Sequence, residues 1–265
     1  MQGQTEANAA ASAATSPLEA RPLTNDDLGW ALNRGWEDFK LRRGDLLLLP
    51  IIYVIVGIVA SALAFNAALF PVIFPLAAGF ALVGPIAAAG FYELARRHEA
   101  GLDSGWSHFL DPLKGRPRGP LLALSAMLLV LFLAWLASAQ AIYGATLGRL
   151  GPVTPADFMR DLFSTSQGLT MIIVGNLVGG LFAVVTLAVS AFSFPLAVDK
   201  GTAAGAAVAT SVAVFRRNPA VMLGWGLRVA LILLLGALPL FVGLMLALPV
   251  LGYATWHLYT RAVHR

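Results

Sequence analysis

The sequence predicts an all-α membrane protein, a polytopic helical bundle of six transmembrane helices arranged as three hairpins, with amphipathic helices on the cytoplasmic side. Of the 265 residues, 58% are hydrophobic and only 12% are charged, whereas an ordinary soluble domain has roughly a quarter charged residues. Several charge-free runs are long enough to cross a bilayer, which takes roughly 20 apolar residues. Lys and Arg residues also flank those ends of the runs that would lie on one side of the membrane.

The composition excludes several classes of protein. A chain with so few charged residues cannot cover a soluble surface, and it is too apolar to be disordered. The chain has no cysteine, which excludes disulfide scaffolds, thiolate metal sites, thiol nucleophiles and iron–sulfur clusters.

The first charge-free run, 46–92, is too long for one transmembrane helix. Asn66 and the prolines Pro71 and Pro75 mark a turn within it, because proline favours helix starts and breaks helix interiors. The run therefore predicts two spans, 46–66 and 70–92.

Later runs predict four more spans. The run 162–198 begins with a polar stretch, 164–167, that is typical of a helix cap. The run 219–260 contains a single charge and is divided by Pro239. The four remaining predicted spans are 121–148, 169–195, 219–238 and 239–259.

The charge distribution predicts that both termini are cytoplasmic. Basic residues precede the first span, follow the last span and fill the loops after spans two and four, while the opposite side has only Arg149 and Arg160. An even number of spans agrees with this orientation. Residues 201–215 are uncharged, short and rich in small side chains, and we interpret them as an interfacial or re-entrant helix.

Three regions follow along the chain. Residues 1–24 are expected to be a disordered cytoplasmic tail, 25–45 an interfacial amphipathic helix and 46–262 the six-span domain. Residues 25–45 either lie in the membrane interface or pack against the protein's own helices. Their predicted apolar face consists of Leu28, Leu32, Trp36 and Phe39.

An internal duplication is one interpretation of two matching segments. Segments 85–97 and 249–261 both place proline, an aromatic residue, leucine and arginine in step. Three units, each an amphipathic segment followed by a helical hairpin, would explain the match. Chance similarity between apolar sequences is the alternative. Such repeats occur in transporters but also in membrane proteins without a transport role.

Arg228 is the most unusual single residue, because it lies about ten residues from either end of the fifth span. A charge at that depth is costly and commonly faces the interior of the bundle. It would bind an anion or a lipid headgroup, form a gating ion pair, or bond structurally to neighbouring helices. A snorkelling side chain is a further interpretation. The polar residues Gln140 and Asn176 are the other candidates inside spans.

Glu93, Asp199 and His257 lie at the predicted cytoplasmic ends of spans two, four and six. Helix capping and ion pairing explain them, and Glu93 has Arg97 at the favourable i,i+4 spacing. Their similar depth would also suit a catalytic cluster. The sequence lacks an HExxH motif, a P-loop and a serine elbow, so we expect no catalytic activity, no metal site and no cofactor.

Five stretches of the chain stand out, namely GWEDF at 35–39, GP at 84–85, GFYELARRHEAG at 90–101, AFSFP at 191–195, and 211–218. They resemble a bacterial family of predicted integral membrane proteins, domain of unknown function 2189, whose members are sometimes labelled cytochrome c oxidase subunit I-like. The resemblance covers about 28–262, with Ala95 standing where relatives usually have serine. It implies a six-span domain in the inner membrane and no established activity. An oxidase catalytic subunit needs several intramembrane histidines, whereas this chain offers only His257.

The sequence therefore favours a non-catalytic accessory, assembly or membrane-organising factor of the inner membrane. The alternative is a transporter or channel for a small anionic or amphiphilic solute, with Arg228 in its pathway. A membrane enzyme using Glu93, Asp199 and His257 is a third hypothesis. The expected partners are the bilayer, anionic headgroups at the cytoplasmic face and a membrane-protein complex. The dispersed basic residues do not indicate nucleic acid.

Overall fold

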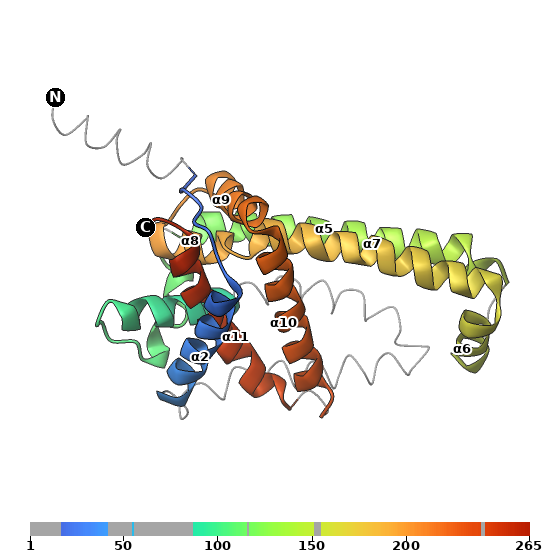
Figure 1. The fold of residues 1–265 in the computed structure, drawn as a ribbon, viewed down its shortest axis with the longest axis horizontal. Coiled ribbons are helices and arrows are strands. Elements are labelled where there is room, and N and C mark those ends of the chain that lie inside the picture. The colour runs from blue at the N-terminus through green and yellow to red at the C-terminus, as the bar shows by residue number, and fades with distance from the viewer. Residues whose placement is uncertain (1–16, 42–54, 56–86, 116, 151–154, 240–241) are drawn as a thin grey trace.

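The computed structural model describes residues 17–41, 55, 87–115, 117–150, 155–239 and 242–265 (Figure 1). Every named element in these residues is a helix, and their one β-type contact is an isolated bridge between Ala20 and Val263. The all-α prediction is therefore confirmed. The first predicted span, 46–66, lies outside the described residues except for Ile55, and the second is described only from residue 87.

Two long apolar helices, α5 (Arg118–Ala145) and α7 (Ser166–Ser190), pack side by side and extend away from the other helices (Figure 1). We call this pair the arm. Both helices, and α10 (Pro219–Ala237), are long and apolar enough to cross a membrane. The third, fourth and fifth predicted spans thus correspond to helices that could cross a bilayer.

The sixth predicted span falls on α11 (Leu244–Ala262), which is not among the candidate spans of the described residues. Its second half carries His257, Arg261 and aromatic side chains, and most of that half is buried. In Figure 1, α10 and α11 run across the direction of the arm. The described helices therefore do not confirm the predicted arrangement of six spans in three hairpins.

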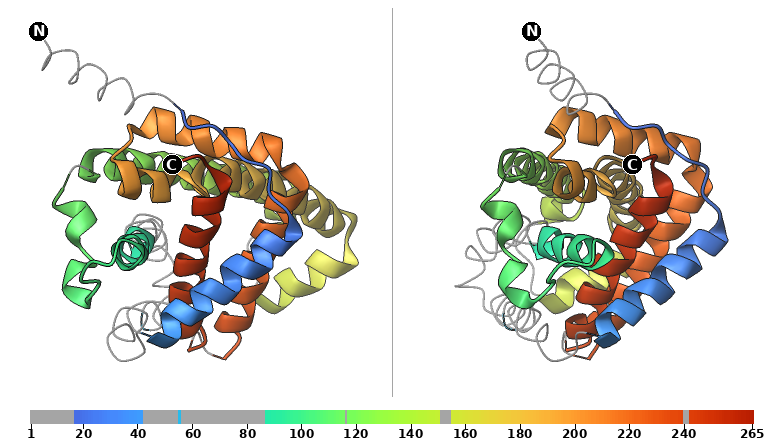
Figure 2. Two further views of the ribbon diagram at one scale, coloured as in Figure 1. Left: turned by 60° about the vertical axis from the view of Figure 1, so that its left-hand side comes forward. Right: turned by 90° about the vertical axis from the view of Figure 1, so that its left-hand side faces the viewer.

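Helix α2 (Asn25–Leu41) lies along α11, as both views in Figure 2 show. A Cβ on Gly35 would lie 2.6 Å from the Val250 carbonyl oxygen and 2.7 Å from the Ala254 nitrogen, so only glycine permits this close approach. Leu28 and Phe39 of the predicted apolar face are buried, whereas Trp36 is 44% exposed. The buried face of α2 differs from the predicted one because α2 packs on α11. The residues buried on α2 are Leu28, Ala31, Gly35, Asp38 and Phe39.

Residues 17–24 are held against the rest of the chain, although they belong to the segment expected to be disordered. The backbone nitrogen of Leu18 donates to the Thr210 hydroxyl at 2.9 Å, and that of Leu23 donates to Asn218 Oδ1 at 2.7 Å. The acceptors belong to α9 (Ala204–Arg217) and to the residue that follows it. Residues 1–16 lie outside the described part of the chain.

The segment 201–215 forms most of α9, a 14-residue helix. At 1.5 Å per residue α9 is about 21 Å long, shorter than the roughly 30 Å hydrocarbon core of a bilayer. It packs against α7 and against the short helix α8 (Ser193–Lys200). Its buried face combines small and polar side chains, namely Ala206, Ala207, Thr210, Ser211 and Val214.

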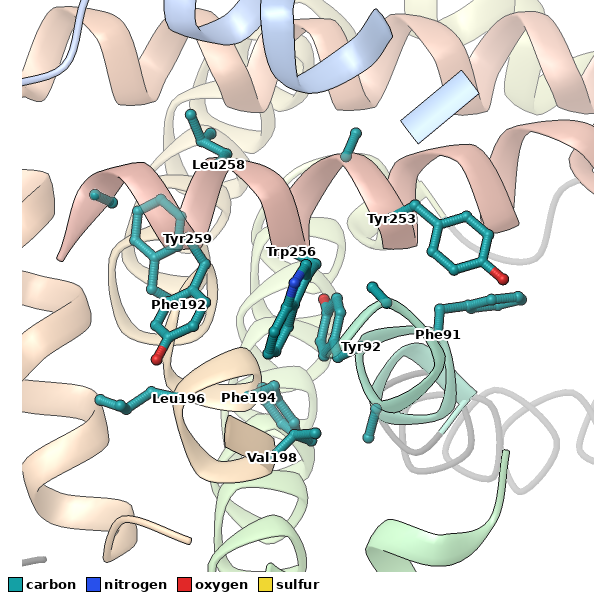
Figure 3. Close-up of a cluster of buried hydrophobic side chains, with 14 of the residues drawn as sticks. Phe91, Tyr92, Phe192, Phe194, Leu196, Val198, Tyr253, Trp256, Leu258 and Tyr259 are labelled. Carbon is teal, nitrogen blue, oxygen red and sulfur yellow. The ribbon is translucent and has the colours of Figure 1, made fainter. Parts of the chain in front are cut away.

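The hydrophobic core lies where α8 and α11 meet the helical residues 87–99. Figure 3 shows Trp256 pointing from α11 into the space between Tyr92 and Phe194. Phe192 and Tyr259 are completely buried beside them. The packed centre of the described structure is thus an aromatic core at one end of the arm.

Candidate functional site

Charged and polar side chains surround one side of this aromatic core. Two of them come from the end of α8, which stops because Gly201 adopts a left-handed conformation, with φ of 63°. The others come from α2, residues 87–99, α11 and the last residue of the chain. We call this set the polar cluster, and it comprises Asp38, Glu93, Arg96, Glu99, Asp199, Lys200, His257, Tyr259 and Arg265.

Glu93 is nearly buried and pairs with Arg96. Arg96 donates from Nε to Glu93 Oε2 at 2.8 Å and from Nη2 to Oε1 at 2.7 Å. Arg97, the partner that the sequence predicts, is more distant, with Nη1 3.6 Å from Oε1. A two-pronged pair is both stronger and more directional than a single contact. Glu93 therefore fixes the position of the Arg96 guanidinium.

Asp199 is held by α11 across the core. The Tyr259 hydroxyl donates to Asp199 Oδ2 at 2.8 Å. The same oxygen lies 3.9 Å from Lys200 Nζ and 3.9 Å from Arg265 Nη1. The Asp199 side chain is only 10% exposed, so these contacts do more than cap a solvated helix end. They join α8 to the C-terminal end of α11.

A cavity of about 230 Å³ lies beside these two carboxylates. The structure therefore brings together Glu93 and Asp199, which the sequence places at similar depth, but it does not add His257 to the same wall. Three carboxylates and two cations face the cavity, so its charges largely compensate one another. The charged lining residues are Glu93, Arg96, Asp111, Asp199 and Lys200.

His257 joins α11 to α2 instead. Its Nε2 atom lies 2.8 Å from Oδ2 of Asp38, whose side chain is 9% exposed. His98 approaches the other carboxylate oxygen, with Nε2 3.9 Å from Oδ1. The Trp30 ring packs edge-on against the His257 ring at 5.7 Å between centroids. His257 thus belongs to a contact between three helices.

Glu99 and Arg265 are members of the cluster that sequence reasoning missed as site residues. Trp256 Nε1 donates to Glu99 Oε2 at 3.1 Å, and Arg265 donates to both carboxylate oxygens. Partial burial acts to raise the pKa of Glu99, but the hydrogen bonds and charge of Arg265 hold this pKa below its usual value. The position of Glu99 in the GFYELARRHEAG stretch is the signal that could have identified it.

A second ion-pair group surrounds the short helices η1 (Trp106–His108) and η2 (Asp111–Leu113). His108 Nδ1 lies 2.6 Å from Asp111 Oδ2, and Arg97 Nη2 lies 3.2 Å from His108 Nε2. The hydrogen bond from His108 holds the pKa of Asp111 below its usual value. Sequence reasoning missed this group too, because Arg97 lies 11 residues before His108 and only the fold brings them together.

Arg228 reaches back along its own helix. Its Nη1 atom donates to the Gly224 carbonyl at 3.1 Å, one turn closer to the start of α10. Gly224 leaves room for the guanidinium, because a Cβ there would lie 3.2 Å from Nη1. Asn25 Oδ1 and Leu28 Cδ1 lie within 4 Å of the same point. This geometry matches the snorkelling interpretation and places the charge beside the start of α2.

Gln140 and Asn176 do not join Arg228. Both are exposed, Gln140 on α5 and Asn176 on α7, and Asn176 Nδ2 donates to the Ile172 carbonyl of its own helix at 2.7 Å. A second, apolar cavity of about 180 Å³ lies between residues 87–92, α10 and α11. None of the three polar candidates lines either cavity.

The arrangement of the polar cluster is suited to holding helices together. Its carboxylates accept hydrogen bonds from arginine, tyrosine, tryptophan and histidine side chains of the same chain. Within the described ranges, no group of three or more His, Asp or Glu side chains is placed to hold a metal ion.

Comparison with known proteins identifies a family. Residues 73–199 match the model of a family described as predicted integral membrane protein (DUF2189), the family that the sequence resembles. The match includes Glu93, Arg96 and Asp199 but not α2, α10 or α11. No curated protein and no solved structure matches the chain. Residues 73–199, somewhat less than half of the chain, are therefore similar to this family of predicted integral membrane proteins.

Proposed function

We propose that this protein is a non-catalytic accessory, assembly or membrane-organising factor of the inner membrane. One observation carries the proposal. The charged side chains of the polar cluster bind one another, whereas the arm exposes apolar side chains along its length. Leu169, Leu177 and Leu181 of α7 are each more than half exposed. Such a molecule presents apolar helix faces to lipid or to another membrane protein rather than a reactive site.

The proposal includes six spans with both termini in the cytoplasm. The excess of Lys and Arg in the corresponding loops supports this orientation. Arg118 at the start of α5 and Ser190 at the end of α7 are the helix ends beside the polar cluster. In this orientation they lie near the cytoplasmic surface. Exposed basic side chains in the same region would meet anionic lipid headgroups. They include Lys40, Lys114, Arg216 and Arg217.

The first experiment extracts the protein from native membranes in mild detergent and identifies the proteins and lipids that co-purify by mass spectrometry. A reproducible stoichiometric complex with other membrane proteins is expected. Isolated protein that carries one small solute would overturn the accessory role in favour of transport. An absorption spectrum of the same sample tests for haem, and a stoichiometric Soret band would contradict the expectation that no cofactor is bound.

Transport of a small anionic or amphiphilic solute is the second candidate, favoured by the half-buried charge of Arg228. Replacing Arg228 with leucine separates the two roles. The accessory proposal expects Arg228→Leu to lower stability in detergent, because the bond to Gly224 and the contact with the start of α2 are lost. A variant that is fully stable but no longer moves or binds the co-purified solute would favour transport.

A further inference from the structure

At the far end of the arm, the connection between α5 and α7 contains a helix that the sequence analysis does not predict. Helix α6 (Pro155–Ser164) follows η3 (Leu147–Leu150) and lies across the end of α7 (Figures 1 and 2). We propose that α6 is an in-plane membrane helix whose apolar side inserts among lipid chains at the surface opposite the polar cluster. The inference needs only that the arm crosses the membrane, and it holds whether the protein is an accessory factor or a transporter.

The residues of α6 separate into two sides. Phe158 and Leu162 are one turn apart, and Met159 and Phe163 are one turn apart on the neighbouring stripe. Together they form a continuous apolar side. The charged residues occupy the opposite side and pair with one another, because Arg160 lies 2.9 Å from an Asp157 oxygen and 3.4 Å from an Asp161 oxygen.

Only half of the apolar side is used within the described chain. Phe158 and Leu162 are half-buried, and the Phe158 ring lies 6.3 Å from the Tyr143 ring of α5. Met159 is 52% exposed and Phe163 is 73% exposed. The open apolar stripe is therefore next to the stripe that packs on the arm.

A close-packed corner holds α6 at its angle to α7. Thr165 precedes α7, donates from its hydroxyl to the Asp161 carbonyl and accepts from the Gly168 nitrogen. A Cβ on Gly168 would lie 2.3 Å from the carbonyl oxygens of Asp161 and Leu162, so only glycine fits. The turn between the two helices is thus fixed by contacts rather than by a flexible linker.

The length of the arm places this corner at a membrane surface. At 1.5 Å per residue, the 28 residues of α5 span about 42 Å and the 25 residues of α7 about 37 Å. Both exceed the roughly 30 Å of the hydrocarbon core. If the arm crosses the bilayer, α6 lies at the boundary between headgroups and chains, the depth of interfacial amphipathic helices.

We expect lipid chains to cover the open apolar stripe of α6, because of the charges on this helix and the position of the stripe. Two aspartates and one arginine give the polar side no positive excess, so attraction to anionic headgroups does not hold the helix. The insertion is therefore apolar and should be as strong in uncharged phosphatidylcholine vesicles as in anionic ones, and unaffected by salt.

The absence of cysteine from the chain permits a direct test. Phe163→Cys on the apolar side of α6 and Ser164→Cys, about 100° away around the helix on the polar side, are each spin-labelled in full-length protein reconstituted into phosphatidylcholine vesicles. Collisions of the label with oxygen, which concentrates in lipid, are compared with collisions with a water-soluble nickel chelate. The label at 163 is expected to favour oxygen several-fold, and the label at 164 is expected to favour nickel. Met159→Cys should follow Phe163→Cys.

Three results would overturn the proposal. Equal nickel accessibility at 163 and 164 would place both sides of α6 in water. Protection at 163 from both reagents, with spin–spin broadening that disappears on dilution with unlabelled protein, would show that a second copy covers the stripe. Protection without broadening would show that another protein segment covers it. Flotation of the vesicles measures membrane insertion of the whole protein separately. A failure of the α6 proposal can therefore be distinguished from a failure of the proposed function.

Discussion

At the scale of single residues, two glycines of α2 offer a matched test of the packing between α2 and α11. A Cβ on Gly35 would meet the backbone of α11 at 2.6–2.7 Å, whereas a Cβ on Gly29 would meet nothing within 4 Å. Gly35→Ala should therefore lower the free energy of unfolding by about 1–3 kcal/mol through overpacking. Gly29→Ala should be neutral or stabilise by up to about 1 kcal/mol, because alanine favours helix. Thermal unfolding in detergent measures both, and equal effects would contradict this packing.

Two Glu–Arg pairs at i,i+3 spacing differ mainly in burial. The Glu93 side chain is 7% exposed beside Arg96, whereas that of Glu37 is 53% exposed beside Arg34. Glu93→Gln should cost about 1–3 kcal/mol, because a charged hydrogen-bonded pair is broken in a largely buried place. Glu37→Gln should cost less than about 0.5 kcal/mol. The same thermal assay compares them, and a larger effect at Glu37 would refute the structural role of Glu93.

The residues of the polar cluster show how far sequence reasoning reaches at this scale. Glu93, Asp199 and His257 could be selected because charges beside apolar runs stand out. Their partners could not, because Asp38 lies far from His257 in the sequence, and so does Tyr259 from Asp199. Only the fold brings these residues together. Arg228 stood out for the same reason as Glu93, but the direction in which its side chain extends depends on Gly224 and α2.

At the scale of elements, the attachment of the C-terminal end of α11 should depend on pH through Glu99. The pKa of Glu99 is lower in the folded protein than its usual value of 4.5. Its ionised form therefore stabilises the fold above pH 4.5, and this contribution disappears as the pH falls below that value. The difference in melting temperature between wild type and Glu99→Gln should be largest near pH 7. It should shrink as the pH falls below 4.5.

A double variant provides the control for this prediction. If Arg265 is the source of the effect, Glu99→Gln combined with Arg265→Gln should differ little from either single variant, because both remove the same interaction. A melting-temperature difference that stays constant from pH 7 to pH 3 would show that the ionisation of Glu99 does not stabilise the fold.

Helices α5 and α7 were predictable because each contains one long charge-free apolar run. Helix α10 was predictable because its run carries a single charge and Pro239 divides it from the next span. Helix α11 was harder, since its first half has the composition of a span while its second half has buried polar and aromatic residues. Periodicity groups Trp36 with Leu28 and Phe39 on one face of α2, but it does not say which of these side chains a neighbouring helix covers. Helix α6 was missed because a ten-residue amphipathic helix between two spans reads as a polar loop.

At the scale of the whole molecule, the arm separates two ends with different chemistry. One end carries the polar cluster and the basic residues, and the other carries α6 with its self-compensating charges. In the orientation that we propose from the positive-inside rule, the basic end lies in the cytoplasm and α6 lies on the outer side of the membrane. This assignment depends on the whole chain rather than on one residue, so a test must report on both ends.

Fusions to alkaline phosphatase, which is active only outside the cytoplasm, provide that test. A fusion after residue 155 should be active, because α5 would carry the enzyme across the membrane to the side of α6. A fusion after residue 110, between η1 and η2, should be inactive, and green fluorescent protein fused at the same point should fluoresce. The reverse pattern would invert the orientation. Activity at both points or at neither would mean that α5 does not cross the membrane, and with it the interfacial position of α6 would fail.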